Sequence, residues 1–166
     1  MSRCKTTATI IVYVPTGIPL PWAVRMVSEV GGRVRSVNED LRRVVASAGL
    51  KESSKIIGAL VERGVPLGNI SVEATAVCRV DSWRPPPGLR PLKGASRPVY
   101  IGICGERLVM VEPKKGIVLI KIGRPTRLKM PPPTLGPGDF VLNDLPKPEA
   151  VGEVVSCVLS GGGEKR

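Results

Sequence analysis

Residues 81–98 form a proline-rich stretch that separates two parts of the chain with different sequence patterns. The stretch reads DSWRPPPGLRPLKGASRP and contains five prolines. Proline has no amide hydrogen to donate, and its ring blocks a continuing helix, so this stretch cannot be a helix or an interior strand. We therefore expect a stiff linker or ordered arm over 81–98, with a folded region on each side of it.

The first eighty residues alternate between patterns typical of strands and of helices. Trp22, Met26 and Val30 recur at helical spacing, and Gly31-Gly32 follow them as a helix stop. Residues 69–80 alternate between apolar and polar side chains, which predicts a long strand with one face on a core. We expect an α/β sandwich over 1–80, in the order strand, helix, strand, helix, helix, strand. The expected elements are 7–14, 19–30, 33–37, 39–48, 53–63 and 69–80.

Two of the expected helices, 39–48 and 53–63, are adjacent in the sequence and separated by a short turn. Asn38 is a suitable N-cap, and the acidic residues after it favour the positive end of a helix. Two amphipathic helices joined by a short turn with a glycine resemble a helix-turn-helix. However, Glu52 at the start of the second helix would repel phosphate, so we interpret the pair as helices that pack on the N-terminal sheet.

Residues 99–160 show the pattern of an all-β region. Gly105-Glu106 between two apolar runs indicates a hairpin with a type II′ turn. We expect strands at 99–104, 107–112, 117–122, 140–142 and 151–159. Five short strands favour a small antiparallel β-barrel, because closure removes exposed edges. We expect the tail, residues 161–166, to be flexible.

Composition limits the chemistry that the chain can perform. Histidine is absent, which removes the usual neutral-pH base and the commonest metal ligand. The four cysteines, at 4, 78, 104 and 157, form no C-x-x-C pair. We therefore expect no metal site, no cofactor and no catalytic residues. A non-enzymatic protein is favoured, and enzymatic activity is left open. Cys78, Cys104 and Cys157 lie in apolar runs and are interpreted as small buried side chains, with a disulfide left open.

The same composition bears on the source and location of the protein. Glutamine is absent, asparagine occurs only at 38, 69 and 143, and there are 17 prolines. Few thermolabile amides and many loop prolines favour a thermophile. No apolar run reaches the roughly 18 residues that a membrane-spanning helix needs, and the first residues lack an apolar signal core. We expect an intracellular, cytoplasmic protein.

A large positive charge points to the class of partner. The chain has 25 Lys and Arg against 14 Asp and Glu, a formal charge of +11. Such an excess favours an anionic partner, which can be nucleic acid, anionic lipid or an acidic protein, although a thermophile surface rich in Lys and Arg would give the same charge. The cations concentrate in the proline-rich stretch and in residues 114–129, where no acid interrupts them, and Trp83 could stack on a base. The candidate nucleic-acid-binding residues are Trp83, Arg84, Arg90, Lys93, Arg97, Lys114, Lys115, Lys121, Arg124, Arg127 and Lys129.

The sequence supports one leading function and two alternatives. The leading hypothesis is a non-enzymatic protein that binds RNA or single-stranded nucleic acid, with loop Lys and Arg on the phosphate backbone. The preference for RNA depends on the barrel, because small barrels commonly bind single strands. The first alternative is a structural or interaction subunit of a larger, ribonucleoprotein-type assembly. The second is a small-ligand or nucleotide-binding protein with its site between the two halves.

Overall fold

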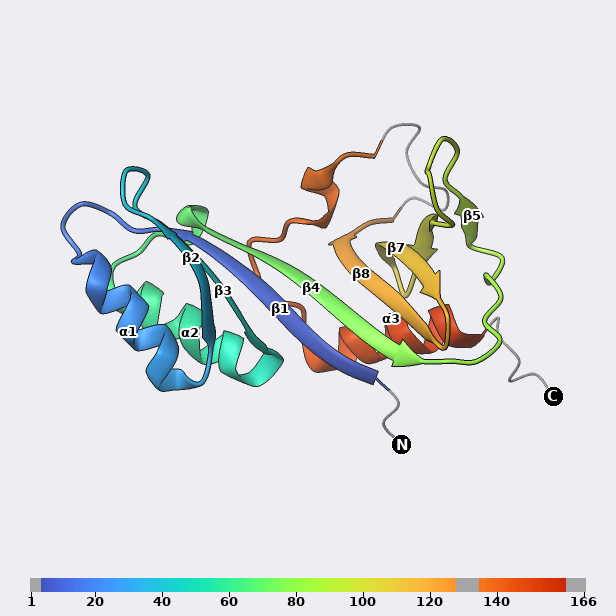
Figure 1. Cartoon of the computed structure of the whole chain (residues 1–166), viewed down its shortest axis with the longest axis horizontal. Coiled ribbons are helices and arrows are strands. Elements are labelled where there is room, and N and C mark those ends of the chain that lie inside the picture. Colours follow the sequence, from blue (N-terminus) through green and yellow to red (C-terminus); the bar gives the residue numbers. More distant parts are fainter. Residues whose placement is uncertain (1–3, 128–134, 161–166) are drawn as a thin grey trace. The chain divides into compact units, whose positions relative to one another are not determined.

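A computed structural model describes residues 4–127 and 135–160 of the chain (Figure 1). The described residues form eight strands and three α-helices. The strands are hydrogen-bonded into one antiparallel sheet in the order β2-β3-β1-β4-β8-β7-β6-β5, and this sheet is not closed. The fold is therefore mixed α+β, as the sequence predicts, but the expected barrel is not confirmed.

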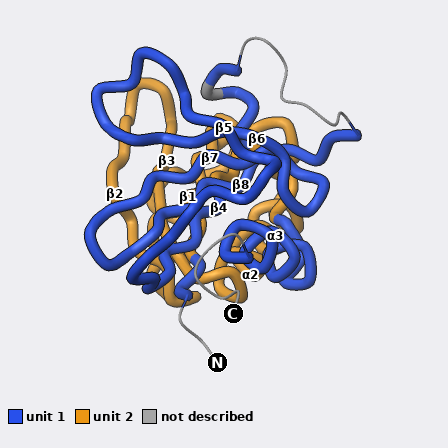
Figure 2. The backbone as a smooth tube through the Cα atoms, turned by 90° about the vertical axis from the view of Figure 1, so that its right-hand side faces the viewer, with its two compact units in different colours: residues 1–6, 74–141, 146–166 blue, residues 7–73, 142–145 orange. Residues whose placement is uncertain are grey.

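The elements follow the chain in this order: β1 (Cys4–Tyr13), α1 (Leu20–Val30), β2 (Arg33–Asn38), β3 (Arg43–Gly49), α2 (Leu50–Arg63), η1 (Leu67–Asn69), β4 (Ile70–Arg79), β5 (Leu89–Pro91), β6 (Tyr100–Cys104), β7 (Arg107–Lys114), β8 (Ile117–Pro125), η2 (Pro137–Phe140) and α3 (Pro148–Ser160). Two compact units, coloured separately in Figure 2, divide them. Unit 1 contains residues 1–6, 74–141 and 146–166, and unit 2 contains 7–73 and 142–145. Strands β1 and β4 contribute residues to both units.

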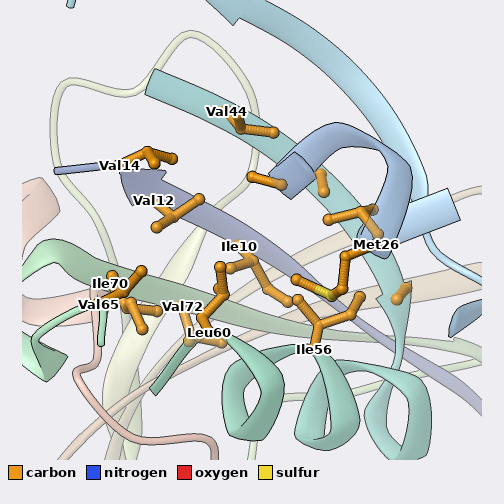
Figure 3. Packing of buried hydrophobic residues seen from close by; sticks show 14 of the residues in the cluster. Ile10, Val12, Val14, Met26, Val44, Ile56, Leu60, Val65, Ile70 and Val72 are labelled. Carbon is orange, nitrogen blue, oxygen red and sulfur yellow. The ribbon is translucent and has the colours of Figure 1, made fainter. Parts of the chain in front are cut away.

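Unit 2 has the chain order β-α-β-β-α-β, with the sheet order β2-β3-β1-β4. This is the split β-α-β arrangement, in which one strand lies between the two strands that a helix connects. Alternate residues of β1, Ala8, Ile10 and Val12, are buried, because the period of two points them to a single face. Figure 3 shows Ile10 beside Met26 of α1 and Ile56 of α2, so the helices cover this face of the unit 2 sheet.

The prediction of a helix at 39–48 is wrong, because residues 43–49 form strand β3. Val44, Ala46 and Ala48 are buried in alternation, and β3 pairs antiparallel with both β1 and β2. The side chain of Asn38 does accept a hydrogen bond from the amide of Leu41, at 3.0 Å, but it caps a turn. The order of unit 2 is consequently strand, helix, strand, strand, helix, strand, and the helix-turn-helix resemblance does not hold.

Arg42 fixes the turn that replaces this helix. Its backbone is left-handed, with φ of 53°, which ends any helical continuation. Its guanidinium donates hydrogen bonds to the carbonyl oxygens of Val14 at 2.9 Å and Pro15 at 3.0 Å, and also to that of Ile18. The side chain thus satisfies three carbonyls of the loop between β1 and α1. This contact joins residues 24 or more positions apart, so local sequence pattern does not indicate it.

Unit 1 contains the predicted three-stranded meander of β6, β7 and β8. The hairpin between β6 and β7 turns at Gly105 and Glu106, whose φ angles of 61° and 64° are both positive. Two positive φ angles define a type I′ turn, so the predicted type II′ turn is wrong. The proline-rich stretch contributes β5, which pairs with β6 at the edge of the sheet, where a proline is tolerated.

The two remaining strands of the expected barrel have other structures. Residues 148–160 form the helix α3, in which Val151, Val154 and Val158 are buried at helical spacing. The sequence pattern suggested a strand because valine is common in strands, but the spacing of three and four residues is that of one helix face. Of the expected strand 140–142, only Leu142 makes a bridge, to Val72, and Phe140 ends the short helix η2.

Disulfides and close backbone approaches hold unit 1 together. Cys4 is bonded to Cys78, and Cys104 of β6 is bonded to Cys157 of α3, which settles the disulfide state that the sequence left open. Cys78 and Cys104 are buried, as predicted, and Cys157 is half-buried. Gly105 lies against the backbone of Val154, where an added Cβ would stand 3.1 Å from the amide nitrogen. Helix α3 therefore lies on the face of the sheet that carries the buried Cys104.

Candidate nucleic-acid interface

The positive charge of the chain is concentrated in unit 1. Among the described residues, unit 1 has thirteen Lys and Arg against six Asp and Glu, a net charge of +7. Unit 2 has eight against seven, a net charge of +1. Every described cation among the candidate binding residues belongs to unit 1. A polyanion would therefore be attracted to unit 1 far more strongly than to unit 2.

Strand register places four cations on the face of the unit 1 sheet that points away from α3. On β8, Val118, Ile120 and Ile122 are buried on the α3 side, so Lys121 points to the opposite side. The pairs Thr75 with Lys121 and Lys121 with Met110 extend this row, which continues through Ile101 to Arg90. A second row joins Arg79, Ile117 and Lys114 across β4, β8 and β7. We call the face that carries Arg79, Arg90, Lys114 and Lys121 the basic sheet face.

Within the described residues of unit 1, the basic sheet face has one acidic residue, and that residue is engaged. Glu112 of β7 forms an ion pair with Arg97, and its side chain is only 15% exposed. Glu73 of β4, which belongs to unit 2, lies on the same side of its strand as Thr75 and Arg79. The exposed acids of α3, Glu149 and Glu153, lie on the other side of the sheet. The four cations of the basic sheet face outnumber its carboxylates, so this face has an excess of positive charge.

Aliphatic side chains separate the cations on this face. Ile101, Met110, Ile117 and Leu119 are half-buried, and Val77 of β4 is 36% exposed. They give the Lys and Arg stems a rigid surface to lie on while the charged ends reach solvent. A rigid sheet under mobile cations is the combination that phosphate contacts require.

The structure places the other predicted cations in loops and ends of unit 1, some of them already paired. Arg84, Lys93 and Lys115 are exposed in loops, and Arg127 is exposed after β8. Arg97 is paired with Glu112, and Arg124 donates to Asp139 at 2.9 Å. Lys129 lies outside the described residues. These cations lie before, between and after the strands that carry the basic sheet face. Two of them, Arg97 and Arg124, are paired with a carboxylate.

Trp83 has a structural environment in unit 1. Its indole nitrogen donates a hydrogen bond to the carbonyl of Val158, at 2.8 Å, near the end of α3. Its ring packs edge-on against Tyr100, with ring centroids 5.3 Å apart. These contacts hold the ring on the α3 side of the sheet, because Tyr100 lies in register with the buried Val111. The structure therefore does not bring Trp83 together with the basic sheet face.

Arg107 and Asp139 have perturbed ionisation in unit 1. Desolvation by burial lowers the pKa of Arg107, whose guanidinium donates to the carbonyl of Gly123 at 3.1 Å. The pKa of Asp139 is lowered chiefly because its carboxylate accepts a hydrogen bond from the amide of Gly136, and secondarily because Arg124 donates to it. Both groups hold loops in place, and neither lies on the basic sheet face.

A shallow hollow on unit 2 offers little for catalysis. Trp22, Ala59, Glu62 and Arg63 line it, and the Arg63 guanidinium lies 4.7 Å from the centre of the Trp22 ring. The arginine thus covers the aromatic ring that could otherwise receive a flat ligand. Within residues 4–127 and 135–160, no group of three or more cysteine or acidic side chains is placed to bind a metal.

Arg79 lies on the basic sheet face but is not among the nucleic-acid-binding residues predicted from the sequence. It ends β4, and the alternation of 69–80 already assigned it to the polar side of that strand. What the sequence could not show is that β8 lies beside β4 and puts Arg79 in a row with Lys114.

Comparisons of the chain with protein-family models, curated proteins and solved structures found no match. In the part of the chain that the structure describes, no helix is long and apolar enough to cross a membrane.

Proposed function

We propose that this protein binds nucleic acid through phosphate contacts made by the basic sheet face and the exposed loop cations of unit 1. The observation that supports the proposal is the register of Arg79, Arg90, Lys114 and Lys121 on the side of the sheet opposite α3, in the unit that carries the excess charge. Phosphate contacts dominate the affinity of such proteins, and each one releases condensed counterions.

RNA is the first ligand to test. The preference for single-stranded RNA depended on a closed barrel, and the open sheet removes that reason. The remaining reason for nucleic acid is the phosphodiester charge itself. Retention on a labelled RNA of about 25 nucleotides is expected at ~50 mM salt and is expected to collapse by ~200 mM.

The decisive variant changes three cations of the basic sheet face, Arg79→Gln, Lys114→Gln and Lys121→Gln. Its matched control removes the same charge from exposed positions of unit 2: Arg25→Gln, Lys51→Gln and Lys55→Gln. In fluorescence anisotropy, the first variant should weaken RNA binding about tenfold or more and lower the slope of log K against log salt by about 2. The control should leave both values near those of the parent protein.

Equal losses in the two variants would show that only net charge matters, and the proposed site would be wrong.

A further variant changes Arg84, Arg90, Lys93 and Arg97 to Glu and tests the loop cations of the proline-rich stretch. Unchanged retention in that variant would exclude the stretch as part of the interface. Circular dichroism of each variant establishes that the fold is retained.

The exposed aliphatic residues favour one second candidate, a structural subunit that docks on a protein. Val77 is 36% exposed on the basic sheet face, and Leu92 is 39% exposed in the proline-rich stretch. Co-purification with a protein partner that survives nuclease and about 1 M salt would support this candidate, because such salt screens charge contacts beyond ~3 Å. Loss of the partner on nuclease treatment would support nucleic acid.

A further inference from the structure

The basic sheet face contains no aromatic side chain on which a base could stack. The chain has five aromatic residues, and all of them lie in the described part. Trp83, Tyr100 and Phe140 belong to unit 1, but Trp83 packs on Tyr100 and Phe140 is buried. Trp22 and Tyr13 belong to unit 2. Proteins that bind single strands obtain much of their affinity from base stacking on aromatic rings, which this face lacks.

Unit 1 also lacks the amide side chains that read base edges. Glutamine is absent from the chain, and Asn38, Asn69 and Asn143 all belong to unit 2. Asn38 accepts a hydrogen bond from Leu41, and Asn69 donates one to the carbonyl of Tyr13. Asparagine and glutamine are the usual bidentate partners of adenine. The cations of the face can bind phosphates, and such contacts carry no sequence information.

The cations of the basic sheet face lie farther apart than contacts to neighbouring phosphates of one nucleic-acid strand would require. Arg79 and Lys114 flank Ile117, so their Cα atoms are separated by two strand spacings, about 10 Å. Lys121 and Arg90 are separated by three spacings, about 14 Å, and the two rows lie four residues apart, about 13 Å. These separations are similar to the width of a nucleic-acid groove, about 12 Å for the major groove of B-DNA.

From these three observations we infer that the basic sheet face takes the phosphodiester backbone of a double-stranded nucleic acid and contacts both strands across a groove, independently of sequence. The inference rests on the proposed function and specifies its ligand. Recognition of a duplex by shape and phosphate position needs neither aromatic nor amide side chains, which agrees with the residues on the face. RNA and DNA duplexes share this backbone chemistry, so the experiment must distinguish them.

The experiment compares four probes of about 20 nucleotides at ~100 mM salt by fluorescence anisotropy with the full chain. They are an RNA duplex, one of its single strands, the DNA duplex of the same sequence, and an RNA duplex of shuffled sequence. The RNA or the DNA duplex should bind at least about fivefold more tightly than the single strand, because the strand gains no stacking here. The two RNA duplexes should agree within about threefold, since phosphate contacts carry no sequence information. The preferred duplex identifies the source of the backbone.

A matched pair of variants tests the same inference from the protein side. Tyr13→Ala removes the one aromatic ring that is clearly exposed, at 42%, and should leave every affinity unchanged. Lys121→Gln should weaken duplex binding more than single-strand binding. Tighter binding of the single strand, a tenfold dependence on sequence, or a loss of affinity in Tyr13→Ala would overturn the inference. Failure of all four probes to bind would instead overturn the proposed function.

Discussion

In unit 2, two helices cover one side of the sheet, and aliphatic side chains from β1, β3, β4, α1 and α2 fill the space between (Figure 3). In unit 1, a single helix covers one side, and two disulfides and a glycine contact fix the backbone. Unit 2 is nearly neutral, whereas unit 1 carries a net charge of +7 in its described residues. Both units have a buried apolar core, and unit 1 adds two disulfides to its core while the other face of its sheet carries exposed cations.

The glycine contacts show how closely unit 1 is assembled. An added Cβ at Gly102 of β6 would stand 1.9 Å from the carbonyl oxygen of Gly88, and the Gly88 carbonyl accepts a hydrogen bond from the amide of Ile103. The proline-rich stretch can therefore run against β6 only because that position lacks a side chain. The apolar positions of β7 and β8 face α3, and the alternate positions on the other side of the sheet carry Lys114 and Lys121.

Removal of the Cys104–Cys157 disulfide should have the largest effect that this comparison predicts. The double variant Cys104→Ala and Cys157→Ala frees α3 from β6 and opens a loop with a sequence separation of 53 residues. The chain-entropy model assigns such a loop about 4 kcal/mol. Hydrogen exchange followed by mass spectrometry should show faster exchange in β6, β7 and α3, while α2 and β3 keep their protection. Equal acceleration in α2 would contradict the idea that the units are held differently.

Truncation of a buried side chain in the core of unit 2 should lower the free energy of unfolding. Leu60 is fully buried in the aliphatic cluster, so Leu60→Ala leaves a cavity and should cost about 3 kcal/mol in the free energy of unfolding. Val61 is the next residue of the same helix and is 43% exposed, so Val61→Ala is the matched control and should cost under about 0.5 kcal/mol. Denaturant titration measures both values. A similar cost for the two variants would show that α2 is not held by its buried face.

Most strands and helices could be predicted from the sequence, including the short strands β6 and β7, but two valine-rich runs could not. The strands over 69–80 and 117–122 and the helices over 19–30 and 53–63 agree with β4, β8, α1 and α2. Residues 43–49 and 151–159 were assigned to the wrong class. In each run the valines fit a helix face and a strand face equally well, and only packing decides between them. The contacts of Arg42 and the cysteine pairs join distant residues and leave no local signal.

The candidate site was predictable in composition but not in geometry. The cations of residues 84–127 could be identified directly from the sequence, as could the absence of histidine and glutamine. Which of them share a face depends on β4 lying beside β8, and that pairing joins strands separated by about forty residues. Trp83 was expected to stack on a base because tryptophan commonly does. Its hydrogen bond to Val158 depends on α3, which the sequence pattern represented as a strand.

The smallest effect concerns pH and compares one carboxylate from each unit. Hydrogen bonds from Gly136 and Arg124 hold the pKa of Asp139 below its ordinary value of about 3.9. A folded-state pKa below the unfolded value means that the ionised group stabilises unit 1 above about pH 4 and loses this contribution as the pH falls through its folded pKa. Asp139→Asn should therefore lower the thermal midpoint slightly at pH 7, and the difference from the parent should shrink as the pH falls from about 4 toward 2.

Asp144 of unit 2 provides the control, because Asp144→Asn makes the same charge change at an exposed position. The midpoint of that variant should follow the parent protein at both pH values. The effect of Asp139→Asn should be small in any case, because its partner Arg124 is 44% exposed and water screens the pair. A difference that persists undiminished at pH 2 would mean that the asparagine disturbs the packing of η2. Such a result would contradict the claim that the ionised carboxylate stabilises unit 1.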